Sequence, residues 1–263
     1  MSTYLKNLTI LKLGGSVITD KSKQNHINMQ TIQRIAEEVS TATSTVSLLL
    51  VHGGGSFGHP IAKKYQIHKG WYSPEQKIGF SETRRAMMTL NKTVIDIFLA
   101  EGIPVVSVQP SACTLTNSGR ITHMDLEPTR SLLKFGFVPV LFGDAVMDIS
   151  QGIAILSGDQ IVTYLAKELA VKKVIFGTNV DGLLNSDNEV IPEINHQNFE
   201  TLLKLAKESV ASDVTGGMFG KLQEIEPLTK EGKEVIIVNA EKPGIIEEVL
   251  KGRKVVGTYF TGK

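Results

Sequence analysis

The sequence contains lysines, a histidine and glycine-rich turns in an arrangement that could hold phosphate groups. In the first turn, Lys12 precedes two adjacent glycines, Gly14 and Gly15. Because glycine has no Cβ, an anion can approach the backbone N–H groups there, and Lys12 adds a positive charge at the same place. A plain tight turn beside a solvated lysine is the alternative. This turn therefore predicts a phosphate site in outline.

The second turn, residues 52–60, is the most informative stretch of the chain. Gly54 and Gly55 belong to a run of three glycines, whose cost in backbone entropy indicates that another group approaches the main chain closely. Pro60 favours the first position of a helix and disfavours helical geometry at His59, so we expect His59 beside a helix N-terminus. Its imidazole could there bind a phosphate together with the helix-end N–H groups. The alternative for His59 is a cap or an ordinary surface histidine.

Two later turns supply an acid and another lysine. Gly158 and Asp159 open a predicted helix, where an Asp is commonly an N-cap but could also hold lysines in a charged site. Gly216 and Gly217 start another predicted helix, and Lys221 follows about one turn inside it. We expect Lys221 to be a second cation that reaches a transferring phosphoryl group, with a surface lysine as the alternative.

Two weaker signals complete the set of charged and polar candidates. A polar turn with Thr178, Asp181 and Gly182 follows a predicted strand and could contact a ribose or an adenine. Lys21 stands where the lysine of a P-loop would stand, but Asp20 replaces the second glycine of that motif and would repel phosphates. We therefore expect Lys21 to reach a phosphate from an ordinary loop.

Motifs of other enzyme classes find little support. Residues 53–58 match the Gly-x-Gly-x-x-Gly pattern of dinucleotide-binding folds, but residues 63–77 cannot supply the second strand and acid that such folds require. The sequence motifs of serine hydrolases and zinc enzymes are absent. A dinucleotide-dependent oxidoreductase is therefore a distant alternative.

Composition and charge limit the partners. The 263 residues are 41% hydrophobic, and 28 Lys and Arg balance 27 Asp and Glu, so no net field would attract a nucleic acid or an anionic membrane. A single cysteine, Cys113, favours a reducing compartment and provides no metal cluster. Residues 1–9 show no export signal, and no apolar run approaches the ~20 residues that a membrane helix needs. We expect a cytoplasmic protein that binds small molecules.

Alternating strands and helices must position these turns. Apolar runs predict buried strands at residues 8–13, 46–51, 104–108, 138–141, 173–176 and 234–238. Helical spacing predicts helices at residues 29–40, 81–100, 126–135, 159–169 and 218–230. Short apolar pieces predict hairpins, as a rim or lid, at residues 113–115, 120–122, 145–148 and 153–155. The alternation predicts an α/β fold with an open, mostly parallel sheet between two helical layers, shared by two lobes that divide near residue 168.

The motifs together resemble the amino acid kinase superfamily across essentially the whole chain. The residues that carry this resemblance are 12–16, 53–55, 157–159, 178–182 and 215–218, with Lys221. Further segments are similar to the isopentenyl phosphate kinase family, namely 18–21, 52–60, 108–111 and 257–263. In that family the histidine matching His59 binds the acceptor phosphate. Asn179 departs from the Asp that is commoner in its turn.

The resemblance implies an α/β/α sandwich and one kinase-like domain over residues 1–263, with an acceptor-binding lobe at 1–168, a nucleotide-binding lobe at 169–263, and a homodimer. It also implies ATP-dependent phosphorylation of isopentenyl phosphate to isopentenyl diphosphate, with Mg²⁺ held mainly by phosphates. The rivals are a related kinase acting on fosfomycin or another alkyl phosphate or phosphonate, and a non-catalytic nucleotide sensor.

Phosphoryl transfer needs mainly positioning and charge neutralisation, which fixes the expected roles. We expect Lys12, Lys21 and Lys221 to surround the γ-phosphoryl group, Asp159 to hold Lys12 and Lys221 in place, and His59 to bind the acceptor phosphate. Backbone N–H groups toward the two phosphates are expected from Gly14, Gly15, Gly54, Gly55 and Gly158. An apolar pocket for the acceptor tail is expected from Phe80, Thr83, Met87, Val146 and Ile155. Further contacts with ATP are expected from Thr178, Asp181, Gly182, Gly216 and Gly217.

Overall fold

The computed structural model describes residues 8–20, 22–23, 25–42, 46–169, 171–185, 187–195, 198–200, 202–203 and 217–261. Two predicted site residues, Lys21 and Gly216, lie outside these ranges. Within them, no helix combines the length and the apolar character needed to cross a membrane.

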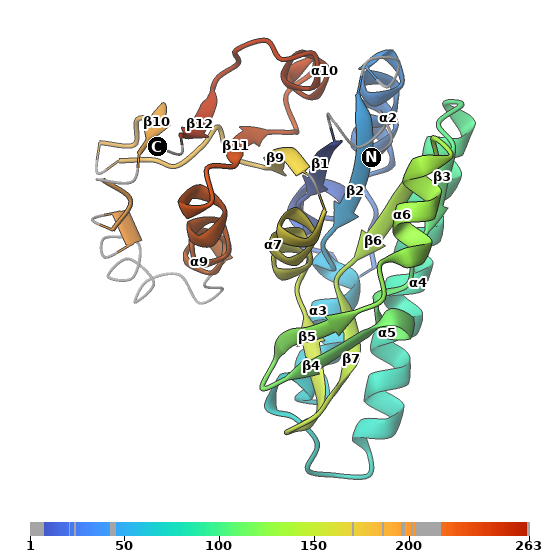
Figure 1. Cartoon of the computed structure of the whole chain (residues 1–263). Helices are drawn as coiled ribbons and strands as arrows, with labels where there is room; N and C mark the ends of the chain where they lie inside the picture. The colour runs from blue at the N-terminus through green and yellow to red at the C-terminus, as the bar shows by residue number, and fades with distance from the viewer. Residues whose placement is uncertain are drawn as a thin grey trace.

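An eight-stranded sheet forms the centre of the fold (Figure 1). Its strands, in spatial order, are β10 (Glu193–Ile194), β12 (Gly257–Phe260), β11 (Glu234–Asn239), β9 (Val171–Thr178), β1 (Leu8–Leu13), β2 (Ser47–His52), β6 (Val138–Phe142) and β3 (Val105–Ser107). Every neighbouring pair is parallel except β11 and β12. The predicted open, mostly parallel sheet is confirmed, and β1 pairs directly with β9, so strands from before and after residue 168 share it.

Helices pack on both faces of this sheet, which confirms the predicted three-layer arrangement. One hydrophobic core lies under α2 (Met29–Ala42), α4 (Gln76–Ala100) and α10 (Ile245–Leu250). The other lies under α6 (Glu127–Lys134), α7 (Gly158–Glu168) and α9 (Gly217–Lys230). Alternating side chains of each strand feed the two cores, as in β1, where Leu11 and Leu13 join the first and Leu8 and Ile10 the second. Covered on both faces, all six residues of β1 are buried, which explains why the strand is mostly apolar.

A second sheet of four strands continues from the carboxyl end of β6 (Figure 1). Its order is β5 (Arg120–Met124), β4 (Thr114–Asn117), β7 (Asp144–Asp148) and β8 (Gly152–Leu156). These strands overlap the segments for which hairpins were predicted. The Asp148 carboxylate joins the two hairpin turns, because it accepts the N–H groups of Ser118 at 3.1 Å and Gln151 at 3.0 Å. This carboxylate therefore ties the two hairpins of the small sheet together at their turns.

Short helices connect these parts, namely α1 (Gly15–Ile18), α3 (Gly55–Lys64), η2 (Ile67–Lys69) and α5 (Pro110–Cys113). Helix α3 begins well before Pro60, so the expectation that Pro60 starts the helix was wrong, and His59 lies inside the helix. Proline cannot donate to the carbonyl four residues earlier, which belongs to Ser56. The N–H of Asn25 donates to that carbonyl instead, at 3.3 Å. This replacement bond lets the helix contain a proline.

Candidate active site

The predicted phosphate-binding turns lie at one edge of the main sheet. In the parallel register, Leu13 at the end of β1 stands beside His52 of β2 and Gly177 of β9. His52 also pairs with Phe142 at the end of β6. Parallel strands bring their carboxyl ends together, and ligands of open α/β sheets bind at that edge. The turns after β1, β2, β6 and β9 are therefore neighbours.

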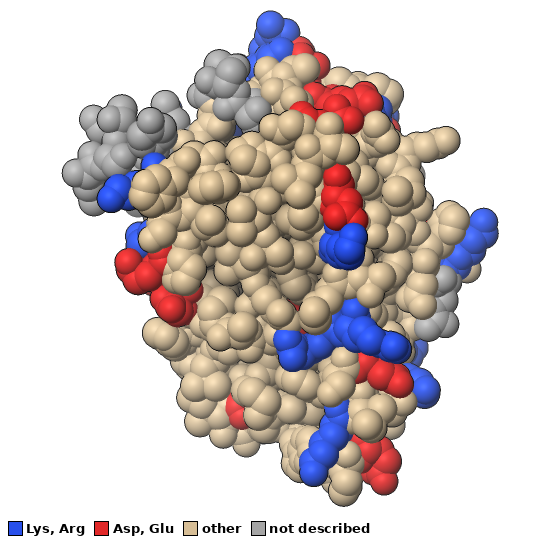
Figure 2. Space-filling model, turned by 90° about the vertical axis from the view of Figure 1, so that its right-hand side faces the viewer, with Lys and Arg blue, Asp and Glu red and all other residues tan. Residues whose placement is uncertain are grey.

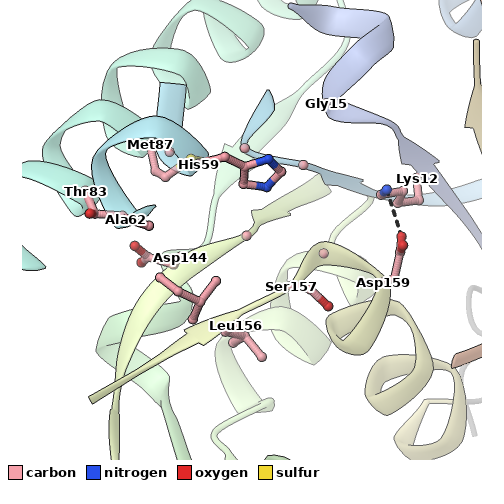
Figure 3. A pocket seen from close by; sticks show the side chains of 16 residues that line it. Lys12, Gly15, His59, Ala62, Thr83, Met87, Asp144, Leu156, Ser157 and Asp159 are labelled. Carbon is pink, nitrogen blue, oxygen red and sulfur yellow. Dashed lines mark ion pairs between the residues drawn. The ribbon is translucent and has the colours of Figure 1, made fainter. Parts of the chain in front are cut away.

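A cavity of about 190 Å³ opens among these turns (Figure 3). The predicted residues that line it are Lys12, Gly15, Gly54, His59, Thr83, Met87, Ile155, Gly158 and Asp159. Residues without a predicted role also line it, and these are Gly53, Gly58, Ala62, Gly143, Asp144, Leu156 and Ser157. The cavity therefore joins candidate phosphate-binding groups and part of the expected tail pocket.

Asp159 links two lysines at the charged end of this cavity. Its carboxylate oxygens lie 2.7 Å from Nζ of Lys12 and 2.8 Å from Nζ of Lys221, and Figure 3 shows the first of these ion pairs. The N-cap of α7 is Ser157, whose hydroxyl accepts the N–H of Gln160 at 3.1 Å. Because Ser157 provides the cap, Asp159 does not, and its carboxylate serves the two lysines.

The charge balance of this cluster favours an anion. Burial would raise the pKa of the Asp159 carboxyl, but the charges of Lys12 and Lys221 outweigh it and hold that pKa well below its usual range. For Lys221, burial and repulsion by Lys12 lower the pKa to about 8, against the attraction of Asp159. The Lys221 ammonium also lies 4.7 Å from the centre of the Phe176 ring. Two ammonium groups around one carboxylate leave a net positive charge for a phosphate.

The glycines of the first two turns are needed because the turns touch each other. A Cβ on Gly15 would lie 2.4 Å from the backbone nitrogen of Gly55, and one on Gly53 would lie 2.9 Å from the nitrogen of Gly15. Gly55 has a φ of 47° and leaves no room for a Cβ, which would lie 2.0 Å from the Thr19 hydroxyl oxygen. Part of the close approach that the sequence indicated is therefore between the two turns themselves.

His59 reaches the cavity from the second turn of α3. Its ring packs over Gly54, whose Cβ would lie 3.6 Å from Nε2 of His59. Figure 3 shows the ring pointing into the cavity, on the side that faces Lys12. The Met87 sulfur fills the space on the other side, where a Cβ on Gly58 would approach it to 2.7 Å. His59 therefore lines the cavity, from within the helix and not from its N-terminus, and its binding of an acceptor phosphate stays a prediction.

The apolar end of the cavity contains part of the predicted tail pocket. Thr83, Met87 and Ile155 line it, whereas Phe80 packs one layer behind, against the small core of Ala62, Ile67, Ala145 and Ile153. Val146 was a wrong assignment, because it is fully buried in the core under α7. Successive residues of a strand point to opposite faces, so Ala145 faces the cavity side of β7 and Val146 faces away from it.

The predicted nucleotide turn follows β9, but its side chains already have protein partners. The Thr178 hydroxyl donates to the Val238 carbonyl at 3.1 Å. The Asp181 carboxylate accepts from Asn239 at 3.0 Å and from the Lys242 ammonium at 2.7 Å. Gly182, with a φ of 155°, would place a Cβ 2.6 Å from the Thr258 hydroxyl oxygen. The sequence analysis assigned no role to Asn239 or Lys242. The signal that could have found them is the polar turn that directly follows the buried strand β11.

Other predicted residues fall into three groups. Gly14 lies at the edge of the site, but its N–H donates to the Gly177 carbonyl at 2.8 Å, so the sheet edge uses the amide that was assigned to phosphate. Gly217 is the first residue of α9. Lys21 and Gly216 lie outside the described residues, so their roles stay predictions.

Asp144 is a cavity residue that sequence reasoning left without a role. Its buried carboxylate accepts the N–H groups of Ser111 at 3.2 Å and Ala145 at 2.9 Å, and burial raises its pKa. The available signal was the pair Gly143 and Asp144 directly after a buried strand, the same context that marked the other turns.

Comparison with known proteins identifies relatives over nearly the full chain. The family model described as the amino acid kinase family matches residues 7–239. The isopentenyl phosphate kinase of Methanothermobacter thermautotrophicus is 41% identical, over 97% of this chain and 100% of the relative. The isopentenyl phosphate kinase of Methanocaldococcus jannaschii is 39% identical, over 95% of this chain and 97% of the relative.

A solved structure agrees with these sequence relatives. An isopentenyl phosphate kinase with 38% identity superposes with a TM-score of 0.86, covering 97% of this chain and 100% of that one. The matched fold, the extent of the family model and the identity to these relatives lead to one assignment. The chain belongs to the amino acid kinase family and, within it, to the isopentenyl phosphate kinases.

Proposed function

We propose that this protein transfers the γ-phosphoryl group of ATP to isopentenyl phosphate and releases isopentenyl diphosphate and ADP. One observation carries the proposal: Lys12, Asp159 and His59 line one cavity, and Lys221 is joined to it through Asp159. Relatives named for this reaction, at 41% and 39% identity, support the choice of acceptor.

The two phosphates meet between the charged cluster and the histidine. His59 and the backbone beside Gly54 bind the acceptor phosphate, and Lys12 and Lys221 bind the γ-phosphoryl group. An acceptor oxygen forms a bond to the γ-phosphorus while the bond from that phosphorus to the bridging oxygen breaks, and ADP leaves with the electron pair. The second pKa of a phosphate monoester is about 6, so the attacking oxygen is already ionised near neutral pH and no strong base is needed.

Mg²⁺ enters this scheme as part of the ATP substrate. Both carboxylate oxygens of Asp159 lie against lysine ammonium groups, so this acid is engaged elsewhere. Among the described residues, no group of three His, Cys, Asp or Glu side chains is placed to hold a metal ion. The side chains described around the charged cluster therefore fit a Mg²⁺ ion that is held mainly by phosphate oxygens. When bound, such an ion neutralises charge on the donor phosphates.

The wall of the cavity favours an acceptor with a short apolar tail. Ala62, Met87, Ile155 and Leu156 contribute apolar surface beyond His59. A compact C5 chain fits beside the acceptor phosphate in a cavity of about 190 Å³. Fosfomycin, or another alkyl phosphate or phosphonate, is the alternative acceptor that the same wall could accept.

A coupled assay of ADP release tests the proposal across five acceptors, namely isopentenyl phosphate, dimethylallyl phosphate, fosfomycin, acetylglutamate and UMP. We expect the highest kcat/KM with isopentenyl phosphate. A higher value with fosfomycin would establish the rival kinase. ATP binding without ADP release from any acceptor would establish the nucleotide sensor.

We also propose that two copies associate through the side of the molecule that carries α4, α6 and β3. Figure 2 shows this side, where a broad uncharged area is interrupted near its centre by an acidic and a basic group, with a band of Lys and Arg below them. A groove of about 400 Å³ runs between β3 and α6, and exposed apolar side chains beside it include Phe135 and Phe137. β3 is the edge strand of the main sheet, where a second copy could pair.

Light scattering during size-exclusion chromatography tests this association. We expect twice the chain mass for the wild type and a monomer for Phe135→Glu, with Val256→Glu as a control at an exposed apolar residue elsewhere. Phe135 is 75% exposed and Val256 is 60% exposed, so neither change removes core packing. A monomeric wild type would refute the dimer.

We place the enzyme in the cytosol, where charged, water-soluble substrates such as ATP are found.

A further inference from the structure

The tip of the β4–β5 hairpin rests on the two helices that carry Asp159 and Lys221. Gln160, next to Asp159 on α7, accepts the N–H of Ile121 at 3.0 Å and donates to the Gly119 carbonyl at 3.0 Å. Gln160 is 7% exposed, so these bonds are shielded from water. The hairpin is therefore fixed to α7 immediately beside the charged cluster.

A second contact joins the same hairpin to α9. Both terminal nitrogens of the Arg120 guanidinium donate to the Glu224 carboxylate, one of them at 3.1 Å. The two parallel bonds fix the relative orientation of the groups, which a single lysine contact could not do. The Glu224 side chain is 11% exposed, whereas that of Arg120 is 61% exposed, so the acid is part of the interior and the arginine reaches over it.

Glu224 lies on the same side of α9 as Lys221. Residues three apart on a helix are neighbours on its surface, and both side chains are buried. The Glu224 carbonyl also accepts the Thr163 hydroxyl of α7 at 2.8 Å. A shift of α9 that moved Glu224 would therefore also move Lys221 away from Asp159.

The hairpin is connected to the wall of the acceptor cavity. β4 pairs with β7, and β7 with β8, so the sheet that ends in Arg120 also carries Asp144 and Ile155 of the cavity wall. The Asp148 carboxylate accepts the N–H of Gly119 at 2.8 Å and fixes the hairpin tip to the β7–β8 turn. A contact made by the acceptor on β7 or β8 therefore has a short, hydrogen-bonded route to α9.

We propose that Arg120, Gln160 and Glu224, here called the hairpin clamp, position Lys221 for phosphoryl transfer and couple its placement to the acceptor wall. Arg120 and Glu224 are positioning residues, because they act through the helix that carries Lys221. This inference rests on the proposed kinase reaction. Loss of the clamp should lower kcat more than it raises the KM for ATP or for the acceptor, because Arg120, Gln160 and Glu224 are not among the residues that line the cavity and act through Lys221.

Charge reversal across the clamp provides the test. We expect R120E to lower kcat by about 10- to 100-fold, and the double variant R120E/E224R to recover most of that loss, as coupled neighbours do. Glu224→Gln is a further variant that keeps the buried shape and removes the charge, and it should also lower kcat. Arg253→Glu is the matched control, since Arg253 is 63% exposed and pairs with Glu248.

The outcomes separate the clamp from a purely structural contact and from the proposed reaction. Recovery of kcat in the double variant, with R120E melting no lower than R253E, supports positioning. An unchanged kcat in R120E, or a loss of kcat that follows the loss of melting temperature and is not recovered, overturns the clamp. If the wild type releases no ADP from ATP and isopentenyl phosphate, the proposed reaction itself fails.

Discussion

Replacing Asp159 with Asn tests the central electrostatic feature of the site. The change removes the negative charge between Lys12 and Lys221, whose side chains are each 8% exposed, and keeps the side-chain size. Removing one partner of a buried ion pair typically costs about 3–5 kcal/mol of folding free energy. Lys221 already has a pKa of about 8, and losing Asp159 lowers that pKa further. Lys221 can therefore lose its proton near neutral pH, which places the expected cost near the lower limit, at about 3 kcal/mol.

The same change should reduce catalysis in a pH-dependent way. The protonated form of Lys221 is the one that binds phosphate, so wild-type kcat should fall as pH rises through about 8. In the Asp159→Asn variant the midpoint of this fall should move to lower pH, because the amide no longer stabilises the ammonium. At pH 7 we expect a loss of about 10²–10³ in kcat, the size seen when one preorganised charge-stabilising group is removed.

The assay is kcat from pH 6 to pH 9 with saturating ATP and isopentenyl phosphate, together with urea unfolding of both proteins. Asp96→Asn is the control, since Asp96 and Lys92 form an ion pair whose side chains are 55% and 76% exposed. That variant should retain its kcat and stability, because exposed pairs contribute little. If Asp159→Asn keeps kcat within about threefold and the same alkaline midpoint, the carboxylate does not hold the lysines for transfer.

Three further variants test separate parts of the site. His59→Ala should raise the acceptor KM at least about tenfold while the KM for ATP changes little, because His59 is the proposed ligand of the acceptor phosphate; steady-state kinetics check this. Val146→Ala should lower the free energy of unfolding by about 1–2 kcal/mol in urea and leave the acceptor KM unchanged, because Val146 is in the core. Gly55→Ala should cost at least about 2 kcal/mol in the same unfolding measurement, since the Cβ would meet Thr19 at a φ of 47°.

The strongest elements could be predicted from the sequence because their burial is two-sided. Strands such as β1 and β2 are mostly apolar, since helices cover both faces of the sheet. The short strands β10 and β12 and the six-residue helix α10 have no comparable pattern, and the notable residues of that region were recognised only through family resemblance. The start of helix α3 was predicted too far along the chain. The local sequence does not show that the N–H of Asn25 would donate to the Ser56 carbonyl, to which Pro60 cannot donate.

Site residues that stand in turns at strand ends could be predicted from the sequence. Residues whose role depends on the direction in which the side chain points could be predicted less well. Lys12, His59 and Asp159 stand beside glycine-rich turns at strand ends, and those ends meet because the strands are parallel. Val146 could not be placed, because one residue along a strand separates the cavity face from the core. Asp144 was left unassigned, since a single acid after a strand does not show whether it faces a cavity.

The sheet order explains why Asp159 has a central place in this arrangement. β2, β6 and β3 lie on one side of β1, and β9, β11, β12 and β10 lie on the other. Lys12 is the next-to-last residue of β1, Asp159 lies in the first turn of the helix that follows β8, and Lys221 comes from α9 on the far side. The two ion pairs of Asp159 therefore join both sides of the sheet above its dividing strand. In the proposed reaction the two phosphates meet at this point, so the spacing of the lysines would depend on how the two sides of the sheet are held together.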